Sequence, residues 1–272
     1  MNQPEQGGSW VIGAGCLGSR VNELLRLRDG RVLTVDVAAP ADVMGDAAEE
    51  ETLRRALGRV QPCVVYCCQS THGGGAEDYR RCYRELVRQV ITLVPSARIV
   101  FCSSASVYGK RNGALTDEES PCCPASERGE ILLQTEQLVQ QAGGVVARLA
   151  PLYADGRCEI LRRHLAGEPQ VPGTPSRMLN YLHREDAARA LLLLGGMAQL
   201  PWSLFNVCSE SFRKEQVYAL MTRLTGVPAA PTSAQASRRG ASDVLLDCRR
   251  LRSLGWNPGV SFASFVARTA SR

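Results

Sequence analysis

Short apolar runs alternate with amphipathic segments along the first 150 residues of the chain. The runs typical of β-strands lie at 10–12, 31–35, 63–66, 98–101 and 145–147. Between them, apolar residues recur at helical spacing in the segments 17–25, 79–91 and 131–139. Strands that are buried on both faces read as continuous apolar runs, and strands alternating with helices form parallel sheets through right-handed crossovers. The pattern therefore predicts a doubly wound α/β fold with a parallel sheet.

The regular alternation weakens after residue 150, where proline and glycine interrupt the chain repeatedly. The pattern still predicts helices near 159–165, 185–194 and 214–224 and a strand at 204–207. A stretch rich in Ala, Ser and Pro at 228–242 is typical of a surface loop. We expect residues 1–150 to form the core domain, and residues 151–272 to complete it and to add a small C-terminal cap over the strand ends.

The composition excludes several classes of protein but does not indicate which reaction, if any, the protein catalyses. The chain has 272 residues, 44% of them hydrophobic, and 32 basic against 27 acidic side chains give a net charge of +5. This composition suits a packed globular protein, and scattered arginine pairs such as Arg162-Arg163 do not form the basic stripe that nucleic acid requires. No apolar stretch approaches the roughly 18 residues of a membrane span, and the polar N-terminus lacks the features of a secretion signal. We therefore expect a cytoplasmic protein that binds neither nucleic acid nor membrane.

The eleven cysteines are an odd number, and several lie within predicted strands, as Cys102 does. They contain no C-x-x-C pair of the zinc type, so we expect no metal site. The adjacent pairs Cys67-Cys68 and Cys122-Cys123 suggest redox chemistry, but neighbouring cysteines rarely meet the geometry of a disulfide. We interpret the cysteines as reduced thiols that pack as small apolar side chains.

A glycine-rich turn joins the first predicted strand to the first predicted helix. Gly13, Gly15 and Gly18 form a G-x-G-x-x-G pattern there. In the Rossmann fold, the first glycine makes the tight turn, the second lets a pyrophosphate approach the backbone, and the third lets the helix pack on the strand. The phosphates then lie at the helix N-terminus, where free N–H groups and the helix dipole favour negative charge. The pattern predicts a Rossmann dinucleotide-binding core in residues 1–150.

An acidic residue is expected about 20 positions after such a loop, at the end of the second strand, and Asp36 fills this place. A carboxylate there accepts hydrogen bonds from ribose hydroxyls and repels a 2′-phosphate. NAD is therefore the favoured cofactor, while Arg20, two residues beyond Gly18, keeps NADP as the alternative. The competing interpretation is a glycine turn that only packs a helix, with Asp36 as a solvated strand end.

Further motifs follow at Gly45-Asp46, 101–109, 148–153, 180–186 and 205–207. Their sequences resemble, in the same order, those of the extended short-chain dehydrogenase/reductase superfamily, the nucleotide-sugar epimerase and dehydratase type. The resemblance places Asp46 at the adenine, Ser104 on the catalytic serine and the segment 148–153 beside the nicotinamide. The cofactor contacts expected from the glycine loop and this resemblance together are Gly13, Gly15, Cys16, Leu17, Gly18, Asp36, Asp46, Cys67, Ser103, Pro151 and Tyr153.

The chain departs from the superfamily at the active-site tyrosine and lysine. When Glu136 is aligned, Arg128 stands in the place of the tyrosine and Leu132 in the place of the lysine. Positioned acid–base catalysis contributes roughly 10²–10⁴-fold, and leucine supports none. Arginine stays charged and has no acceptor, so Arg128 cannot act as a base, but it can pair with a carboxylate or phosphate of a substrate. The chain therefore resembles the atypical members that lack the Tyr/Lys pair.

Two other residues are candidates for the proton transfer. His72 lies in the loop after the strand 63–66, and ligands of open α/β sheets bind beyond such strand ends, although a solvated loop histidine fits this position too. Tyr108 is close to Ser104 in sequence, but the superfamily uses a tyrosine at this place for packing. The expected catalytic set is Ser104, Tyr108, His72 and Arg128. We expect His183 to fix local structure and His164 to lie on the surface of a helix.

These expectations define an NAD(P)-dependent oxidoreductase or epimerase-like enzyme acting on a small polar substrate, anionic and nucleotide-linked molecules included. Ser104 would bind the reacting carbonyl or hydroxyl, Arg128 would hold an anionic group, and the C-terminal segment would form the substrate-binding cap. The proton would come from His72, Tyr108, the substrate or water. The alternative is a catalytically inactive NAD(P)-binding sensor or partner protein, as the absent Tyr and Lys predict. The resemblance suggests a homodimer.

Overall fold

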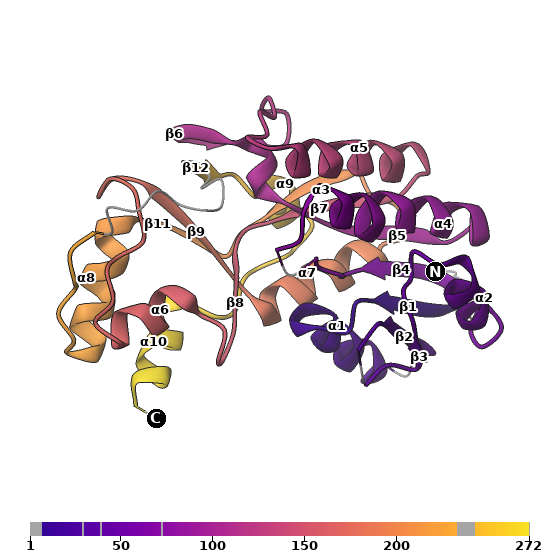
Figure 1. Ribbon diagram of the computed structural model, residues 1–272, viewed down its shortest axis with the longest axis horizontal. Helices are drawn as coiled ribbons and strands as arrows, with labels where there is room; N and C mark the ends of the chain where they lie inside the picture. The colour runs from indigo at the N-terminus through magenta and orange to yellow at the C-terminus, as the bar shows by residue number, and fades with distance from the viewer. Residues whose placement is uncertain (1–6, 29, 39, 72, 233–242, 272) are drawn as a thin grey trace. The chain divides into compact units, whose positions relative to one another are not determined.

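The computed structural model describes residues 7–28, 30–38, 40–71, 73–232 and 243–271 (Figure 1). The strands are β1 Gly8–Ile12, β2 Val32–Asp36, β3 Val43–Met44, β4 Pro62–Cys67, β5 Arg98–Ser104, β6 Lys110–Thr116, β7 Val145–Leu149, β8 Leu152–Tyr153, β9 Met178–His183, β10 Leu204–Val207, β11 Glu210–Arg213 and β12 Asp243–Leu246. The α-helices are α1 Cys16–Arg26, α2 Glu50–Leu57, α3 Ala76–Tyr79, α4 Leu86–Leu93, α5 Glu127–Gln141, α6 Glu159–Leu165, α7 Arg184–Gly196, α8 Lys214–Thr225, α9 Arg249–Ser253 and α10 Phe262–Ala270. A π-helical turn, Arg80–Glu85, joins α3 to α4, and a short 3-10 helix spans Ala105–Tyr108.

A seven-stranded sheet has the strand order β10-β7-β5-β4-β1-β2-β3. β1 pairs in parallel with both β2 and β4, and β4 pairs in parallel with β5. The order of the chain reverses between β1 and β4, and doubly wound folds bind ligands in the crevice beyond the carboxyl ends of strands at such a point. The predicted strands, and the doubly wound Rossmann-like α/β fold, are confirmed.

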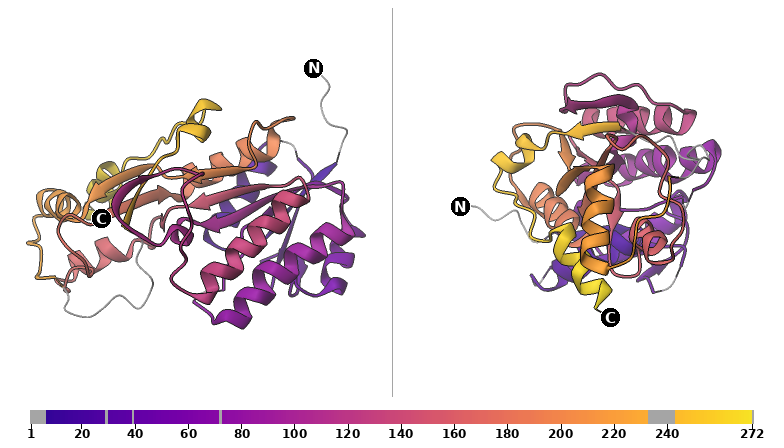
Figure 2. Two further views of the ribbon diagram at one scale, coloured as in Figure 1. Left: turned by 90° about the horizontal axis from the view of Figure 1, so that it is seen from above. Right: turned by 90° about the vertical axis from the view of Figure 1, so that its left-hand side faces the viewer.

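Helices cover both faces of this sheet, as right-handed crossovers require. α4 and α5 run side by side over one face in Figures 1 and 2, and α1 follows β1 on the other. The predicted helix at 79–91 is interrupted by the π-helical turn, which local periodicity does not reveal. The helix at 131–139 is confirmed as part of α5, and buried Leu17 and Val21 anchor α1.

The chain divides into two compact units that are interleaved in sequence. The first unit comprises 1–104, 126–148 and 188–205, and the second comprises 105–125, 149–187 and 206–272. This division differs from the expected boundary near residue 150, because the chain leaves the seven-stranded sheet after β5 and returns to it twice.

The second unit contains a three-stranded sheet of order β11-β9-β8 and a two-stranded sheet of β12 and β6. Its apolar core joins α6, α8 and α10 around Tyr153, Tyr181, Met221, Phe262 and Phe265. The helices predicted at 159–165, 185–194 and 214–224 and the strand at 204–207 are confirmed as α6, α7, α8 and β10. The expectation for His164 is wrong, because this side chain is only 2% exposed and contacts Thr225 of α8 through Nε2.

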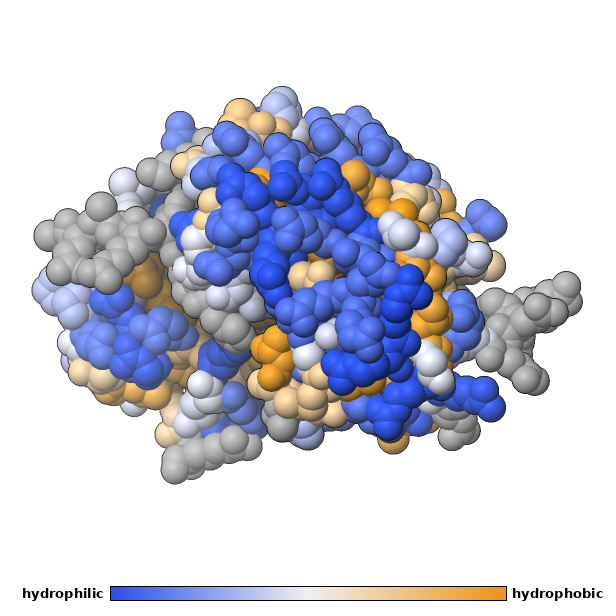
Figure 3. All heavy atoms as spheres, turned by 45° about the vertical axis from the view of Figure 1, so that its right-hand side comes forward, coloured by the Kyte–Doolittle hydropathy of each residue, from blue (hydrophilic) through white to orange (hydrophobic). Residues whose placement is uncertain are grey.

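Hydrophilic side chains occupy most of the face drawn in Figure 3, with hydrophobic atoms in smaller patches between them. Across the residues that the structure describes, no helix combines the length and the apolar character needed to cross a membrane. Of the predicted loop at 228–242, residues 233–242 lie outside the described residues.

Candidate cofactor and active site

The glycine loop between β1 and α1 has the geometry that its spacing predicts. Gly13 has a φ of 88°, and a Cβ added to it would overlap the backbone of Gln69, which follows β4. A Cβ on Gly18 would overlap the carbonyl oxygen of Gly13, so the helix can approach the loop only at a glycine. Gly15 is different: it is exposed, and a Cβ there would have no atom within 4 Å. The loop is therefore closed at its first and third glycines and open at its second.

Asp36 ends β2 and reaches back to this loop. Its Oδ2 accepts a hydrogen bond from the backbone N–H of Ala14 at 2.5 Å, and its Oδ1 accepts one from Ala38 N–H at 3.0 Å. Arg20, the residue that kept NADP as an alternative, forms an ion pair with Glu23 at 2.7 Å on the same helix. The half-buried carboxylate of Asp36 thus lies against the glycine loop, as a ribose-binding group should.

Large apolar side chains are exposed next to Asp36. Their exposure was not predicted from the sequence. Val37 is 69% exposed and Met44 is 44% exposed, and the pairing of β2 with β3 places Met44 opposite Asp36. Asp46 follows on the same segment and binds Arg81 of the π-helical turn at 2.6 Å and Ala48 N–H at 2.8 Å. Exposed apolar surface beside a carboxylate is suited to a flat base linked to a ribose.

A buried ionic network lies behind Ser104, the last residue of β5. Glu136 of α5 is 2% exposed and accepts hydrogen bonds from Arg148 Nη2 of β7 at 2.6 Å and from the Ser103 hydroxyl at 2.5 Å. The hydroxyl of Ser103, one of the expected cofactor contacts, is therefore already engaged. The network fixes the end of β5 against α5 and β7, and so restrains the backbone that carries Ser104. In the sequence, the network is indicated only by Arg148, a charged residue inside the apolar strand β7.

Arg128 lies at the start of α5, against the loop that follows β4. Its Nη1 donates to the carbonyl oxygen of Gly74 at 3.4 Å, and its guanidinium lies 5.8 Å from the centroid of the Tyr79 ring. Leu132, one turn further on, is 5% exposed and packs inside the first unit. His72 belongs to the same loop as Gly74 but lies outside the described residues. The structure therefore brings Arg128 against Gly74 of the described part of this loop.

The other expected cofactor contacts of the first unit are buried or half-buried side chains. Cys67 is 1% exposed, and burial raises the pKa of its thiol far above the usual range. Leu17 is 5% exposed and lies on the buried face of α1, while Cys16 is half-buried at the start of that helix. Within the described ranges, His, Cys, Asp and Glu side chains do not gather in a group of three that could hold a metal ion.

Three expected site residues belong to the second unit. Tyr108 is fully buried and its hydroxyl donates to Asn206 Oδ1 at 2.8 Å, which is the environment of a packing residue. Tyr153 is 2% exposed within a cluster of aromatic rings, where burial raises the pKa of its phenol and its hydroxyl donates to Val260 O at 3.3 Å. Pro151 is exposed beside it. His183 accepts a hydrogen bond from Glu185 N–H at 3.2 Å, in agreement with a local structural role.

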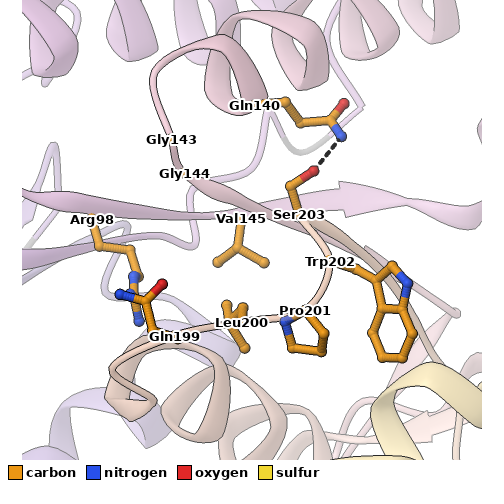
Figure 4. Close-up of a pocket in the computed structure, with 10 residues that line it drawn as sticks. All are labelled: Arg98, Gln140, Gly143, Gly144, Val145, Gln199, Leu200, Pro201, Trp202 and Ser203. Carbon is orange, nitrogen blue, oxygen red and sulfur yellow. Dashed lines mark hydrogen bonds between the residues drawn. The ribbon is translucent and has the colours of Figure 1, made fainter.

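A pocket of about 250 Å³ lies at the opposite ends of the strands (Figure 4). It is bordered by Arg98 at the start of β5, Val145 at the start of β7 and residues 199–203 before β10. Arg98 donates to the carbonyl oxygens of Met197 and Ala198, and Gln140 donates to Ser203 at 2.8 Å. Because it lies at the amino ends of the strands, this pocket is not the site that the glycine loop defines.

The sequence matches a known protein family over most of its length. The model of the NAD dependent epimerase/dehydratase family matches residues 10–208. Protein YeeZ of Escherichia coli strain K12 is 32% identical over 162 residues, which are 57% of this chain and 56% of that protein. The chain thus matches little more than half the length of this curated relative.

Solved structures with a similar fold cover nearly the whole chain. A UDP-glucose 4-epimerase from Thermus thermophilus in complex with NAD has a TM-score of 0.79 and 20% identity, over 97% of this chain and 98% of that one. MoeE5 in complex with UDP-glucose and NAD has a TM-score of 0.79 and 21% identity over the same shares. A GalE-like L-threonine dehydrogenase from Cupriavidus necator has a TM-score of 0.82 and 19% identity, over 97% and 99%. At such identities these structures show the shared fold.

Proposed function

Because the chain belongs to the NAD dependent epimerase/dehydratase family, we propose that it binds NAD at the glycine loop and acts as an NAD-dependent oxidoreductase or epimerase on a small polar substrate. The observation that carries this proposal is the open Gly15 between two closed glycines, with Asp36 bonded to the loop. A dinucleotide needs both features, because its pyrophosphate approaches the backbone at the second glycine and its ribose is bound by the acid.

Each part of the site has a role in holding the cofactor. The N–H groups at the start of α1 would bind the pyrophosphate, since the first turn of a helix leaves them without intrahelical partners. Asp36 would accept hydrogen bonds from the adenosine ribose, and exposed Val37 and Met44 would contact the adenine. When bound, NAD supplies a hydride acceptor or, in its reduced form, a hydride donor.

Ser104 and Arg128 are the residues that we propose to contact the substrate. The hydroxyl of Ser104, at the carboxyl end of β5, would donate a hydrogen bond to the reacting oxygen. Arg128 would bind an anionic group of the substrate, because a guanidinium remains charged and binds carboxylate or phosphate in two-point contacts. The proton would pass to His72, to water or to the substrate itself, because Arg128 and Leu132 cannot carry it.

Asp36→Asn is expected to weaken NADH binding by about tenfold, because one or two hydrogen bonds to a carboxylate are lost or weakened. NADPH binding should weaken less or improve, because the amide no longer repels a 2′-phosphate. Titration of the purified protein with each nucleotide, followed by nicotinamide fluorescence, measures both dissociation constants. If neither nucleotide binds more tightly than about 1 mM, or roughly −4 kcal/mol, the proposed function is wrong.

Arg128→Met is expected to raise KM for an anionic substrate by about tenfold or more, with little change for a neutral analogue, because the charge-assisted contact disappears. The assay is NADH formation or consumption across a panel of sugar nucleotides and small hydroxy or keto acids. Ser104→Ala is the comparison, because it should lower kcat rather than raise KM. Full activity in Ser104→Ala would contradict the assigned role.

A cofactor-binding protein without turnover is the second candidate function. Arg128 and Leu132 favour it, since neither can replace the proton relay that the resemblance places there. Tight NADH binding together with no turnover on any member of the substrate panel would support this second function.

A further inference from the structure

Two cysteines at the carboxyl ends of neighbouring strands face each other inside the first unit. Cys68 directly follows β4, and Cys102 lies in β5. Their Sγ atoms are 3.8 Å apart, and the thiol of Cys102 donates a hydrogen bond to the sulfur of Cys68. Both residues are half-buried rather than sealed in the core. The two cysteines are 34 residues apart in the chain, so their spacing in the sequence does not predict the pair.

The sheet explains why these thiols meet. β4 and β5 are parallel with Cys67 opposite Phe101, so the next residues along, Cys68 and Cys102, are also opposite each other. Side chains alternate between the faces of a strand, which places both thiols on one face and Cys67 on the other. Neighbouring strands are about 4.8 Å apart, within the roughly 4.4–6.8 Å that separates the Cα atoms of a disulfide. Rotation of the two side chains would bring the sulfur atoms together.

We propose that Cys68 and Cys102 form an oxidation site that becomes a disulfide under peroxide. The sulfur of Cys68, as thiolate, attacks one oxygen of hydrogen peroxide, the O–O bond breaks, and a sulfenic acid and hydroxide form. The sulfur of Cys102, after losing its proton, attacks the sulfenyl sulfur and expels a second hydroxide. The two hydroxides take up the two thiol protons, so two thiols and one peroxide give one disulfide and two waters.

Their surroundings distinguish Cys68 and Cys102 from the two cysteines within β4, Cys63 and Cys67. Cys67 is buried, and burial raises the pKa of its thiol far above that of an ordinary cysteine. The pKa of Cys102 is also raised, first by its hydrogen bond to Cys68 and then by burial, which is consistent with Cys102 as the second sulfur to react. Cys63, at the other end of β4, donates to the carbonyl oxygens of Gly7 and Gly8 and lies outside the pair.

The pair also adjoins the glycine loop. Cys68 N–H donates to Ile12 O at 2.8 Å, and a Cβ on Gly13 would lie 2.8 Å from the carbonyl carbon of Cys68. A disulfide that moves Cys68 would therefore shift the backbone against which Gly13 turns. This consequence rests on the proposed function: oxidation should weaken NADH binding by about fivefold or more, the lower end of typical coupling between linked sites.

The test treats the full chain, reduced and then freed of reductant, with hydrogen peroxide. Remaining thiols are alkylated, and peptide mapping by mass spectrometry identifies linked peptides. We expect the eleven free thiols to fall by two and a linked peptide to contain Cys68 and Cys102, reversed by dithiothreitol. Cys68→Ser and Cys102→Ser should each abolish the link, and the control Cys63→Ser should retain it.

The outcomes separate the two proposals. If Cys68 and Cys102 are recovered unlinked after peroxide, each alkylated or separately oxidised, the proposed disulfide is disproved. The peptide map of the unsubstituted chain decides this even where a variant fails to fold. If the disulfide forms and NADH affinity is unchanged, the coupling to the glycine loop is disproved. If neither the reduced nor the oxidised protein binds NADH, the proposed function fails while the oxidation site stands.

Discussion

Glu136→Gln is expected to lower the free energy of unfolding by about 3–5 kcal/mol, because it leaves the buried guanidinium of Arg148 without its counter-charge. Glu136 and Arg148 are 2% and 5% exposed, and the carboxylate also accepts from Ser103. Urea unfolding followed by circular dichroism measures the change. The substitution should also lower the turnover rate, because the network holds the end of β5 and with it the position of Ser104.

An exposed ion pair supplies the matched control. Glu50 and Arg54 form an i, i+4 pair on α2 with side chains about half exposed, so Glu50→Gln should change the free energy of unfolding by no more than about 0.5 kcal/mol. The double variant Glu136→Leu, Arg148→Met should be more stable than Glu136→Gln, because it removes both charges. Equal small losses in Glu136→Gln and Glu50→Gln would contradict the burial of the network.

Gly15→Ala is expected to weaken NADH binding by about 10- to 100-fold while leaving the fold intact. The added methyl would meet no atom within 4 Å, so it costs the protein no packing energy, but it would occupy the space through which a pyrophosphate reaches the helix N-terminus. Losing one or two charge-assisted hydrogen bonds gives an effect of this size. NADH titration measures the affinity, and thermal unfolding without cofactor measures the stability.

Substitutions at two other glycines serve as controls for Gly15→Ala. Gly18→Ala should destabilise the unliganded protein by at least about 1–3 kcal/mol, because its Cβ would overlap the Gly13 carbonyl. Gly196→Ala, at the end of α7 with open space around it, should alter neither stability nor NADH affinity appreciably. Unchanged NADH affinity in Gly15→Ala would place the cofactor elsewhere.

The order of strands and helices could be predicted because it depends on local patterns. Apolar runs identified β1, β2, β4, β5 and β7, and 3.6-residue spacing identified α1, α5 and α8. The glycine loop and Asp36 were predictable for the same reason, since a tight turn and a strand end impose particular residues at short range. The two-residue strand β8 was missed, because two residues carry too little periodicity to be distinguished from loop. The seven-residue β6 and the six-residue β9 were missed too, because polar side chains interrupt their apolar positions.

Contacts between residues far apart in the chain did not follow from these patterns. Glu136 could be placed by alignment, but its pairing with Arg148 and Ser103 depends on how α5 packs against β5 and β7. His164 is buried because α8 covers α6, and Cys68 meets Cys102 because of the register between β4 and β5. Local periodicity specifies which face of an element is apolar, and so it was sufficient for most strands and helices of the seven-stranded sheet. The partner that covers each face is chosen by packing among all the elements together, and this choice produced the ionic network and the thiol pair.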